Sequence, residues 1–166
     1  RSRLARAGAR IDRLRWHRWA TDRSWLRDTG GSFTVDVRDS SLTLVDWRFT
    51  GWAKYPNWRR DNRLPARIAH VREIPRLVAT RPDTGQPMVL EGGALDANGA
   101  GAALATEECL LDTDIQPRNP GLGRDGVETA LATYFGITDL IWLGRGIVGD
   151  DTHGHVDDIA RFVSQD

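Results

Sequence analysis

The feature that most constrains the fold of this chain is a pair of β-hairpins, each followed by a helical segment. The first hairpin is predicted over residues 32–37 and 42–49, which are β-rich and separated by a turn-forming cluster. The second is predicted over 94–96 and 102–106, because Asn98-Gly99 between short apolar runs is a strong hairpin signal. No exact sequence repeat accompanies this recurrence. It nevertheless predicts repeated supersecondary units that need neighbours to bury their apolar faces.

The segments that follow the hairpins have helical character. Residues 63–77 are weakly helical and begin near Pro65, which is tolerated in a first turn. Residues 125–135 carry apolar side chains at helical spacing, and Gly136 is placed to end that helix as a C-cap. The other predicted elements are a helix over 2–14 and strands over 13–19, 88–90, 139–143 and 156–163. The expected fold class is therefore α/β.

Composition places the chain among ordinary soluble proteins. Its 166 residues fit one domain, and 40% are hydrophobic and 28% charged. No apolar run approaches the ~18 residues that a membrane-spanning helix needs, so we expect no membrane partner. The single cysteine excludes an internal disulfide and fits a reducing compartment, so we expect a cytoplasmic protein.

Charge is balanced overall but unevenly distributed along the chain. Residues 1–27 hold nine arginines against two aspartates, whereas residues 107–166 hold twelve acidic residues against four arginines. A basic segment that contains Trp16, Trp19 and Trp25 is compatible with a nucleic-acid surface. The acidic half would repel phosphate, so we favour a solvated helix and a strand whose tryptophans are in the core, with no nucleic-acid partner.

The run GDDTHGHVDDIARF, residues 149–162, is the richest in groups that can carry chemistry. His155 and Asp157 are two residues apart, so on an extended segment they face the same side. An imidazole and a carboxylate on one face can serve a metal ion, a nucleophile or a cationic substrate.

A metal site is the first alternative for this run. His153, His155 and Asp157 have the H-x-H-x-D spacing of metallo-β-lactamase-like zinc hydrolases. That pattern expects another histidine directly after the aspartate, where this chain has Asp158. We therefore expect no metal at this run.

A nucleophilic cysteine is the second alternative. Cys109 is the only thiol, and it follows Glu107 and Glu108 in TEECLL. Two adjacent carboxylates would raise the pKa of the thiol and so disfavour the thiolate. The leucines that follow indicate that Cys109 packs in the core.

The third alternative is a carboxylate-rich site for a cation. Asp28 lies in a glycine-containing turn, and Glu91 ends a strand and is followed by two glycines that would let another group approach closely. Together with His155 and Asp157, these residues could surround a cation. Taken singly, each has an ordinary structural role as a turn residue, a strand end or a cap.

Six motifs occur in a fixed order along the chain: WLRDTG, DWRFTGWAKYPNW, LEGGALDANGAG, TEECLL, RNPGL and GDDTHGHVDDIARF. In these motifs, from about Arg13 to Val163, the chain resembles the agmatine deiminases, within the wider guanidino-group-modifying family that includes arginine and peptidylarginine deiminases. The resemblance implies an α/β propeller of five ββαβ-like modules around a pseudo-fivefold axis. A complete member is about twice as long, so residues 1–166 are expected to be an incomplete single domain without the first and last modules. The abrupt ends of the chain agree with that expectation.

The resemblance also implies roles for particular residues. Asp28 and Asp157 would clamp the guanidinium, since a planar cation with forked donors is well held by carboxylates. His155 would act as the general acid and base, and Glu91 would hold and charge-stabilise its imidazole. No metal or organic cofactor is implied. The family's nucleophilic cysteine lies in a glycine-rich motif near the C-terminus, so Cys109, which matches TEECLL, would not be the nucleophile.

The expected reaction is hydrolysis of agmatine to N-carbamoylputrescine and ammonia through a covalent thiouronium intermediate. The aromatics of DWRFTGW suit a substrate with an alkyl chain and no α-carboxylate. Without the nucleophile this chain alone would be inactive. An arginine or peptidylarginine deiminase-like enzyme, or a non-catalytic guanidinium-binding protein, remains an alternative, and a homo-oligomer is compatible with the sequence.

Overall fold

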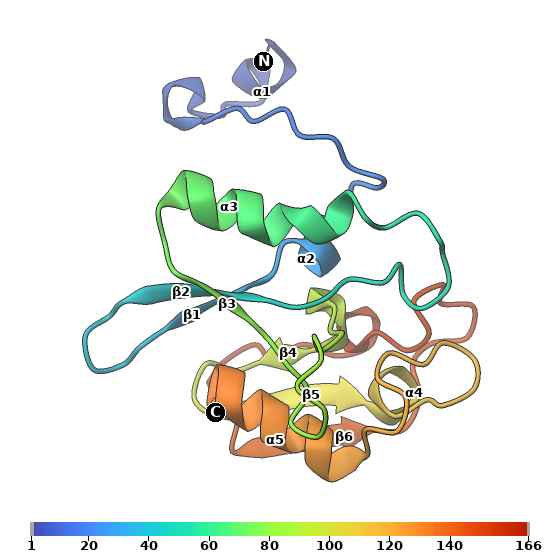
Figure 1. Cartoon of the computed structure of the whole chain (residues 1–166). Coiled ribbons are helices and arrows are strands. Elements are labelled where there is room, and N and C mark those ends of the chain that lie inside the picture. Colours follow the sequence, from blue (N-terminus) through green and yellow to red (C-terminus); the bar gives the residue numbers. More distant parts are fainter. Residues whose placement is uncertain (1, 166) are drawn as a thin grey trace.

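The computed structural model describes residues 2–165, and its first sheet contains three strands. Strand β1 (Ser32–Val35) pairs antiparallel with β2 (Leu42–Asp46), and β3 (Arg76–Val78) pairs parallel with β2. Helix α3 (Leu64–Arg72) connects β2 to β3 and contacts both strands. In Figure 1 this helix lies on the upper side of the sheet.

The second sheet repeats the same arrangement. Strand β4 (Asp96–Ala97) pairs antiparallel with β5 (Ala102–Thr106), and β6 (Asp139–Leu143) pairs parallel with β5. Helix α5 (Arg124–Phe135) connects β5 to β6 and lies in front of this sheet in the view of Figure 1. The described residues therefore contain two hairpin–helix–strand units, and the predicted recurrence is confirmed.

Short elements connect and flank the two units. They are α1 (Ser2–Arg6), α2 (Leu26–Thr29), α4 (Glu107–Leu110) and single 3-10 turns at Ile11–Arg13, Asp61–Arg63, Gly92–Ala94 and Val156–Asp158. The turn at 92–94 packs against both α2 and the turn at 156–158, although these segments are far apart in sequence. No helix among the described residues is long and apolar enough to cross a bilayer.

Local sequence signals explain several element boundaries. Pro65 lies in the first turn of α3, and Gly136 ends α5 with a φ of 67°. In the second hairpin the Asn98 side-chain oxygen accepts hydrogen bonds from the backbone N–H groups of Ala100 and Ala102. These predictions are confirmed because each depends on a few neighbouring residues.

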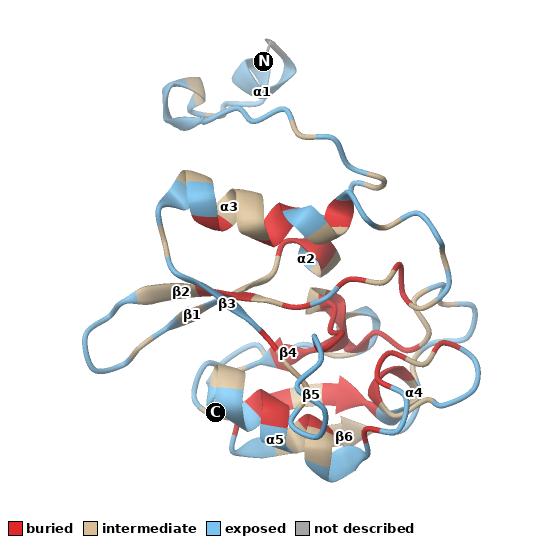
Figure 2. Cartoon of the chain, viewed as in Figure 1, coloured by how far each residue is buried: buried red, intermediate tan, exposed pale blue. Residues whose placement is uncertain are grey.

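The hydrophobic core lies mainly in the second unit. Ala103 and Ala105 on β5 are fully buried in one cluster with Val127 and Leu131 of α5. In this unit a small residue on the strand faces a larger one on the helix, as close packing requires. Figure 2 shows this buried centre, whereas the tip of the β1–β2 hairpin and the N-terminal segment are exposed.

Several sequence-based predictions about strands and helices are wrong. The predicted helix over 2–14 is reduced to α1, and the predicted strand over 88–90 makes only an isolated bridge, from Val89 to Arg48. Neither 13–19 nor 156–163 forms a strand. Residues 156–158 form a 3-10 turn instead, and Val163 is 99% exposed. A strand needs a neighbouring strand for its ladder of backbone hydrogen bonds, and neither run joins one of the two described sheets.

The helix predicted over 63–77 ends earlier, at Arg72. Glu73 adopts a left-handed conformation with a φ of 54°, and Pro75 follows two residues later. Because proline disfavours helical backbone in the residue before it, the chain becomes extended and forms β3.

The tryptophans expected in the core are largely at the surface. Trp16 is 47% exposed and Trp25 is 62% exposed. Without a strand over 13–19, no sheet face carries Trp16 into the interior. Trp25 instead lines the pocket described below.

Candidate active site

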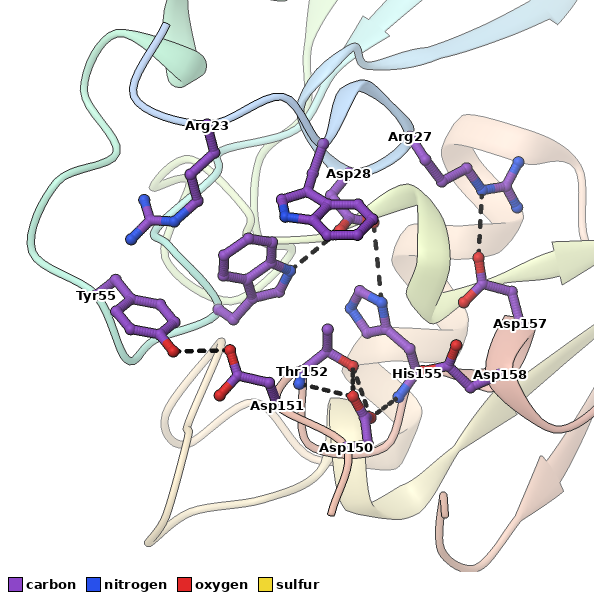
Figure 3. Close-up of a pocket in the computed structure, with 12 residues that line it drawn as sticks. Arg23, Arg27, Asp28, Tyr55, Asp150, Asp151, Thr152, His155, Asp157 and Asp158 are labelled. Atoms are coloured by element: carbon purple, nitrogen blue, oxygen red, sulfur yellow. Dashed lines mark hydrogen bonds and ion pairs between the residues drawn. The ribbon is translucent and has the colours of Figure 1, made fainter. Parts of the chain in front are cut away.

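A pocket of about 400 Å³ opens where three segments of the chain meet (Figure 3). These segments are 23–28, which enters α2, the aromatic loop 52–55 after β2, and the loop 150–158. The lining combines the rings of Trp25, Trp52 and Tyr55 with several carboxylates. Aromatic faces and carboxylates together suit an organic cation.

Two glycines bring the walls of this pocket together. A Cβ at Gly93 would lie 2.3 Å from Nδ1 of His155 and 2.9 Å from Oδ1 of Asp28. A Cβ at Gly92 would lie 2.2 Å from the carbonyl oxygen of Arg27. The prediction that the two glycines after Glu91 allow a close approach is therefore confirmed.

Asp28 contributes a carboxylate that is held in place. Its side chain is only 8% exposed; Oδ1 accepts a hydrogen bond of 3.0 Å from the N–H of Gly93, and Oδ2 one of 3.1 Å from Nε1 of Trp52. Burial raises the pKa of Asp28, the charge of His155 lowers it, and the charge of Glu91 raises it. The net pKa of Asp28 lies above the ordinary value. The site thus contains a carboxylate whose ionised form is stabilised by a positively charged neighbour.

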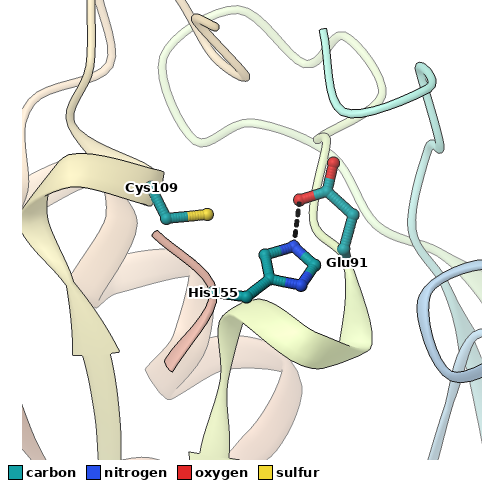
Figure 4. Close-up of side chains that lie close together, drawn as sticks. All are labelled: Glu91, Cys109 and His155. Carbon is teal, nitrogen blue, oxygen red and sulfur yellow. Dashed lines mark ion pairs between the residues drawn. The ribbon is translucent and has the colours of Figure 1, made fainter. Parts of the chain in front are cut away.

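His155 lies between two carboxylates. Its Nδ1 is 3.8 Å from Oδ1 of Asp28, and its Nε2 is 3.7 Å from Oε2 of Glu91 (Figures 3 and 4). Nε2 is buried without a hydrogen-bond partner among the described residues. Burial lowers the pKa of His155, but the effects of Glu91 and Asp28 are larger together, so the pKa lies above the ordinary value.

Glu91 is completely buried and is shared between His155 and Arg118. The Nε of Arg118 is 3.3 Å from each carboxylate oxygen of Glu91. Burial alone would raise the pKa of Glu91, but the charges of Arg118 and His155 outweigh it, so the pKa lies below the ordinary value. Arg118 is a site residue that sequence reasoning missed, because nothing in RNPGL distinguishes a buried arginine from a loop arginine.

The loop that carries His155 is organised around Asp150. One carboxylate oxygen of Asp150 accepts hydrogen bonds from the N–H groups of Gly154, at 2.8 Å, and His155, at 3.2 Å. Gly154 has a φ of 94°, and a Cβ there would lie 3.0 Å from Oγ1 of Thr106. The tight backbone at Gly154 therefore directs His155 inward.

We call Asp28 and His155, together with Glu91 and Arg118, which are fully buried behind them, the buried wall of the pocket. Asp157 lies instead at the edge of the pocket. Its side chain is 20% exposed, and its Oδ2 is 3.7 Å from Nε of Arg27. The structure therefore brings Asp28, Glu91 and His155 together and leaves Asp157 beside an arginine at the rim.

The residues of the H-x-H-x-D spacing do not converge. His153 faces Asp112, at 3.2 Å from Nε2, whereas His155 faces Asp28 and Asp157 faces Arg27. The spacing assumes an extended strand, and this segment is a loop in which His153 has a φ of 61°.

Cys109 is fully buried in the hydrophobic core, as predicted. The pKa of its thiol is raised, mainly by burial and against the effect of Arg118, so the predicted direction is confirmed. The predicted cause, the adjacent Glu107 and Glu108, is wrong. The carboxylates that raise this pKa include Glu91, whereas Glu107 is paired with Arg124 at the surface.

Solved structures share this mixed α/β fold. The agmatine deiminase of Enterococcus faecalis catalysing its reaction superposes with a TM-score of 0.77 at 33% identity, covering 88% of this chain and 39% of that one. A C. jejuni agmatine deiminase variant with substrate bound gives a TM-score of 0.78 at 27% identity, covering 99% and 46%.

Sequence comparison places the chain in a family. All of residues 1–166 match the Porphyromonas-type peptidyl-arginine deiminase family, and the chain belongs to it. An agmatine deiminase of Stutzerimonas stutzeri (strain A1501) is 35% identical over 164 residues, covering 96% of this chain and 42% of the relative. One from Medicago truncatula is 36% identical over 165 residues, covering 92% and 41%. The chain thus spans less than half the length of these curated relatives.

Proposed function

We propose that the protein containing this chain is an agmatine deiminase, which hydrolyses the guanidinium of agmatine to N-carbamoylputrescine and ammonia. The observation that carries the proposal is the buried wall of the pocket, where His155 lies within 4 Å of both Asp28 and Glu91. Family membership and the agmatine deiminases among the relatives support the same reaction.

Asp28 and Asp157 would hold the substrate guanidinium. A guanidinium is planar and presents forked N–H donors, which match the two oxygens of a carboxylate. Both carboxylates line the pocket, and Asp28 is already fixed by Gly93 and Trp52. For Asp157 to take part, its ion pair with Arg27 would have to be exchanged for the substrate.

His155 would move the protons of the reaction. A cysteine thiolate attacks the guanidinium carbon, and His155 protonates the departing nitrogen, so that ammonia leaves and a thiouronium remains. His155 then takes a proton from water, and the resulting hydroxide attacks the same carbon. The C–S bond breaks as the added hydroxyl group loses its proton to solvent, which regenerates the thiolate and releases N-carbamoylputrescine. Cys109 does not line the pocket and its thiol is disfavoured as a thiolate, so we assign the nucleophile to a residue outside these 166.

We also propose that the two hairpin–helix–strand units are internal modules of a five-module propeller. Two consecutive units with the same strand order support this arrangement, since a pseudo-fivefold fold consists of such repeats. Residues 1–166 would then be part of one deiminase domain.

Binding and turnover test the proposal separately. Titration calorimetry of the chain with agmatine should detect binding, and D28A should weaken it about tenfold or more, because a charge-assisted hydrogen bond to a buried carboxylate is lost. The matched control D36A removes a partly exposed aspartate of the first hairpin that does not line the pocket, and it should leave the affinity unchanged. Equal affinities for the wild type and D28A would contradict the clamp.

Turnover distinguishes an enzyme from a non-catalytic binding protein. We expect no ammonia from the 166-residue chain alone, and both ammonia and N-carbamoylputrescine when the complete reading frame is expressed. Agmatine binding without either product in the complete protein would favour the non-catalytic alternative. Preferred turnover of arginine or peptidyl-arginine would assign the protein to the other deiminases.

A further inference from the structure

Arg118 joins three segments that build the buried wall of the pocket. Its Nε faces both oxygens of Glu91, its Nη1 donates a 3.0 Å hydrogen bond to the carbonyl of Gln116, and its Nη2 donates to the carbonyl of Thr152. The side chain is fully buried. A buried guanidinium is costly unless its donors are satisfied, and here all three nitrogens have partners.

The charges around His155 explain why Glu91 needs a second positive partner besides the imidazole. Glu91 and Asp28 both face the imidazole. Without Arg118, loss of the His155 proton would leave the fully buried Glu91 with no positive partner, which a low-dielectric interior strongly disfavours. With Arg118 in place, Glu91 keeps a counter-charge when His155 is neutral.

We propose that Arg118 is a positioning residue that neutralises Glu91 and ties it to the His155 loop, so that His155 can give up its proton as well as accept one. This inference deepens the proposed function and, for its catalytic part, rests on it. The acid step needs an imidazolium and the base step needs a neutral imidazole, so a histidine locked in one charge state cannot perform both.

The other groups around His155 do not supply this positive charge. The ionisable and charged groups near the imidazole include Asp28 from α2, Glu91, Cys109 from α4, Arg118, and Asp150, Asp157 and Asp158 from its own loop and turn. Two further arginines line the same pocket, but Arg27 pairs with Asp157, and Arg23 lies over the rings of Trp52 and Tyr55. Among these cations, Arg118 is the one paired with Glu91.

The direct test is the protonation of His155, followed by NMR on the imidazole of the 166-residue chain. In R118M the pKa of His155 should rise, because the imidazolium becomes the only counter-charge of Glu91. R118K keeps the charge and should hold the pKa near that of the wild type. R161M removes an arginine that pairs with Asp96, another largely buried carboxylate, and should leave His155 unchanged.

The direction of the change separates this role from a purely structural one. If Arg118 merely held the loop in place, its loss would loosen the site, and the pKa of His155 would fall toward its ordinary value. A fall or no change in a folded R118M would overturn the proposal. Should R118M not fold, R118Q removes the same charge while keeping an amide donor, and the same rise is expected.

Turnover by the complete protein gives a second readout. In R118M, kcat for agmatine at neutral pH should drop about tenfold or more, with KM changed less, since the base step lacks neutral imidazole. Activity should partly recover at higher pH, whereas an unaltered pH profile would contradict the proposal. If the complete protein turns over no agmatine, the proposed reaction fails, but the NMR result still decides the role of Arg118.

Discussion

The pocket has a buried wall and an exposed rim, and the two are built from similar charged groups. In the wall, Glu91 and Arg118 are both fully buried and satisfy each other. At the rim, Lys54 pairs with Asp151, which also accepts a 2.7 Å hydrogen bond from the hydroxyl of Tyr55, and these groups are in contact with solvent. The comparison teaches that the location of an ion pair, rather than its kind, decides how much its loss changes the stability of the protein. Water screens the charges at the rim and is excluded from the wall.

The aromatic loop links the two regions. Trp52 donates a hydrogen bond to Asp28 in the wall, while the guanidinium of Arg23 lies 5.3 Å from the Trp52 ring and 4.6 Å from the Tyr55 ring at the rim. A ligand could therefore place its charged end against the wall and its remaining length along the aromatic rim.

Removing one partner of the buried pair should have the largest effect. E91Q leaves Arg118 buried without a counter-charge, so we expect the free energy of unfolding to fall by about 3 kcal/mol or more, measured by urea denaturation. The double variant E91Q/R118M should lose less than the sum of the two single variants, because neither charge is left alone. Strictly additive losses would contradict direct coupling of the two side chains.

Crowding the wall should have a smaller but clear effect. G93A places a methyl group 2.3 Å from Nδ1 of His155, so the imidazole must move, at an expected cost of about 1–3 kcal/mol in the free energy of unfolding. The matched control G144A adds the same methyl group where nothing lies within 4 Å. Stability is measured by thermal or urea denaturation. Equal stabilities of the two variants would show that the side chains of the wall shift to accept the methyl group at little cost.

Charge removal at the rim should have the smallest effect. K54M breaks the ion pair with Asp151, but solvent screens both groups, so we expect the urea midpoint to match that of the wild type. Raising the salt concentration should change the stability of the two proteins equally. A clear loss of stability in K54M would break the distinction between rim and wall.

Local patterns predicted part of this molecule well. Asn98-Gly99 indicated a hairpin and Gly136 a helix end, and both hold because backbone conformation at these positions is set by adjacent residues. The motifs that resemble the deiminases also selected Asp28, Glu91 and His155. In the fold, the imidazole of His155 lies within 4 Å of each of the two carboxylates.

Pairing partners could not be predicted in the same way. Residues 13–19 and 156–163 have apolar runs like those of strands, but neither run joins one of the two described sheets. Strand β3 overlaps the end of the segment 63–77, which was predicted to be helical. Whether an extended run becomes a strand depends on which distant segment lies beside it.

The sequence by itself determined the local turns and caps, the recurrence of hairpin and helix, and the residue types present at the candidate site. The tertiary structure alone decided that Arg118 lies behind Glu91 and that Asp157 is held by Arg27 at the rim. It also decided that burial is the main cause of the raised pKa of Cys109, in place of the glutamates adjacent to it in sequence. The physical reason is that turns and caps arise from neighbours along the chain, whereas burial and charge pairing arise from contacts between segments far apart in it.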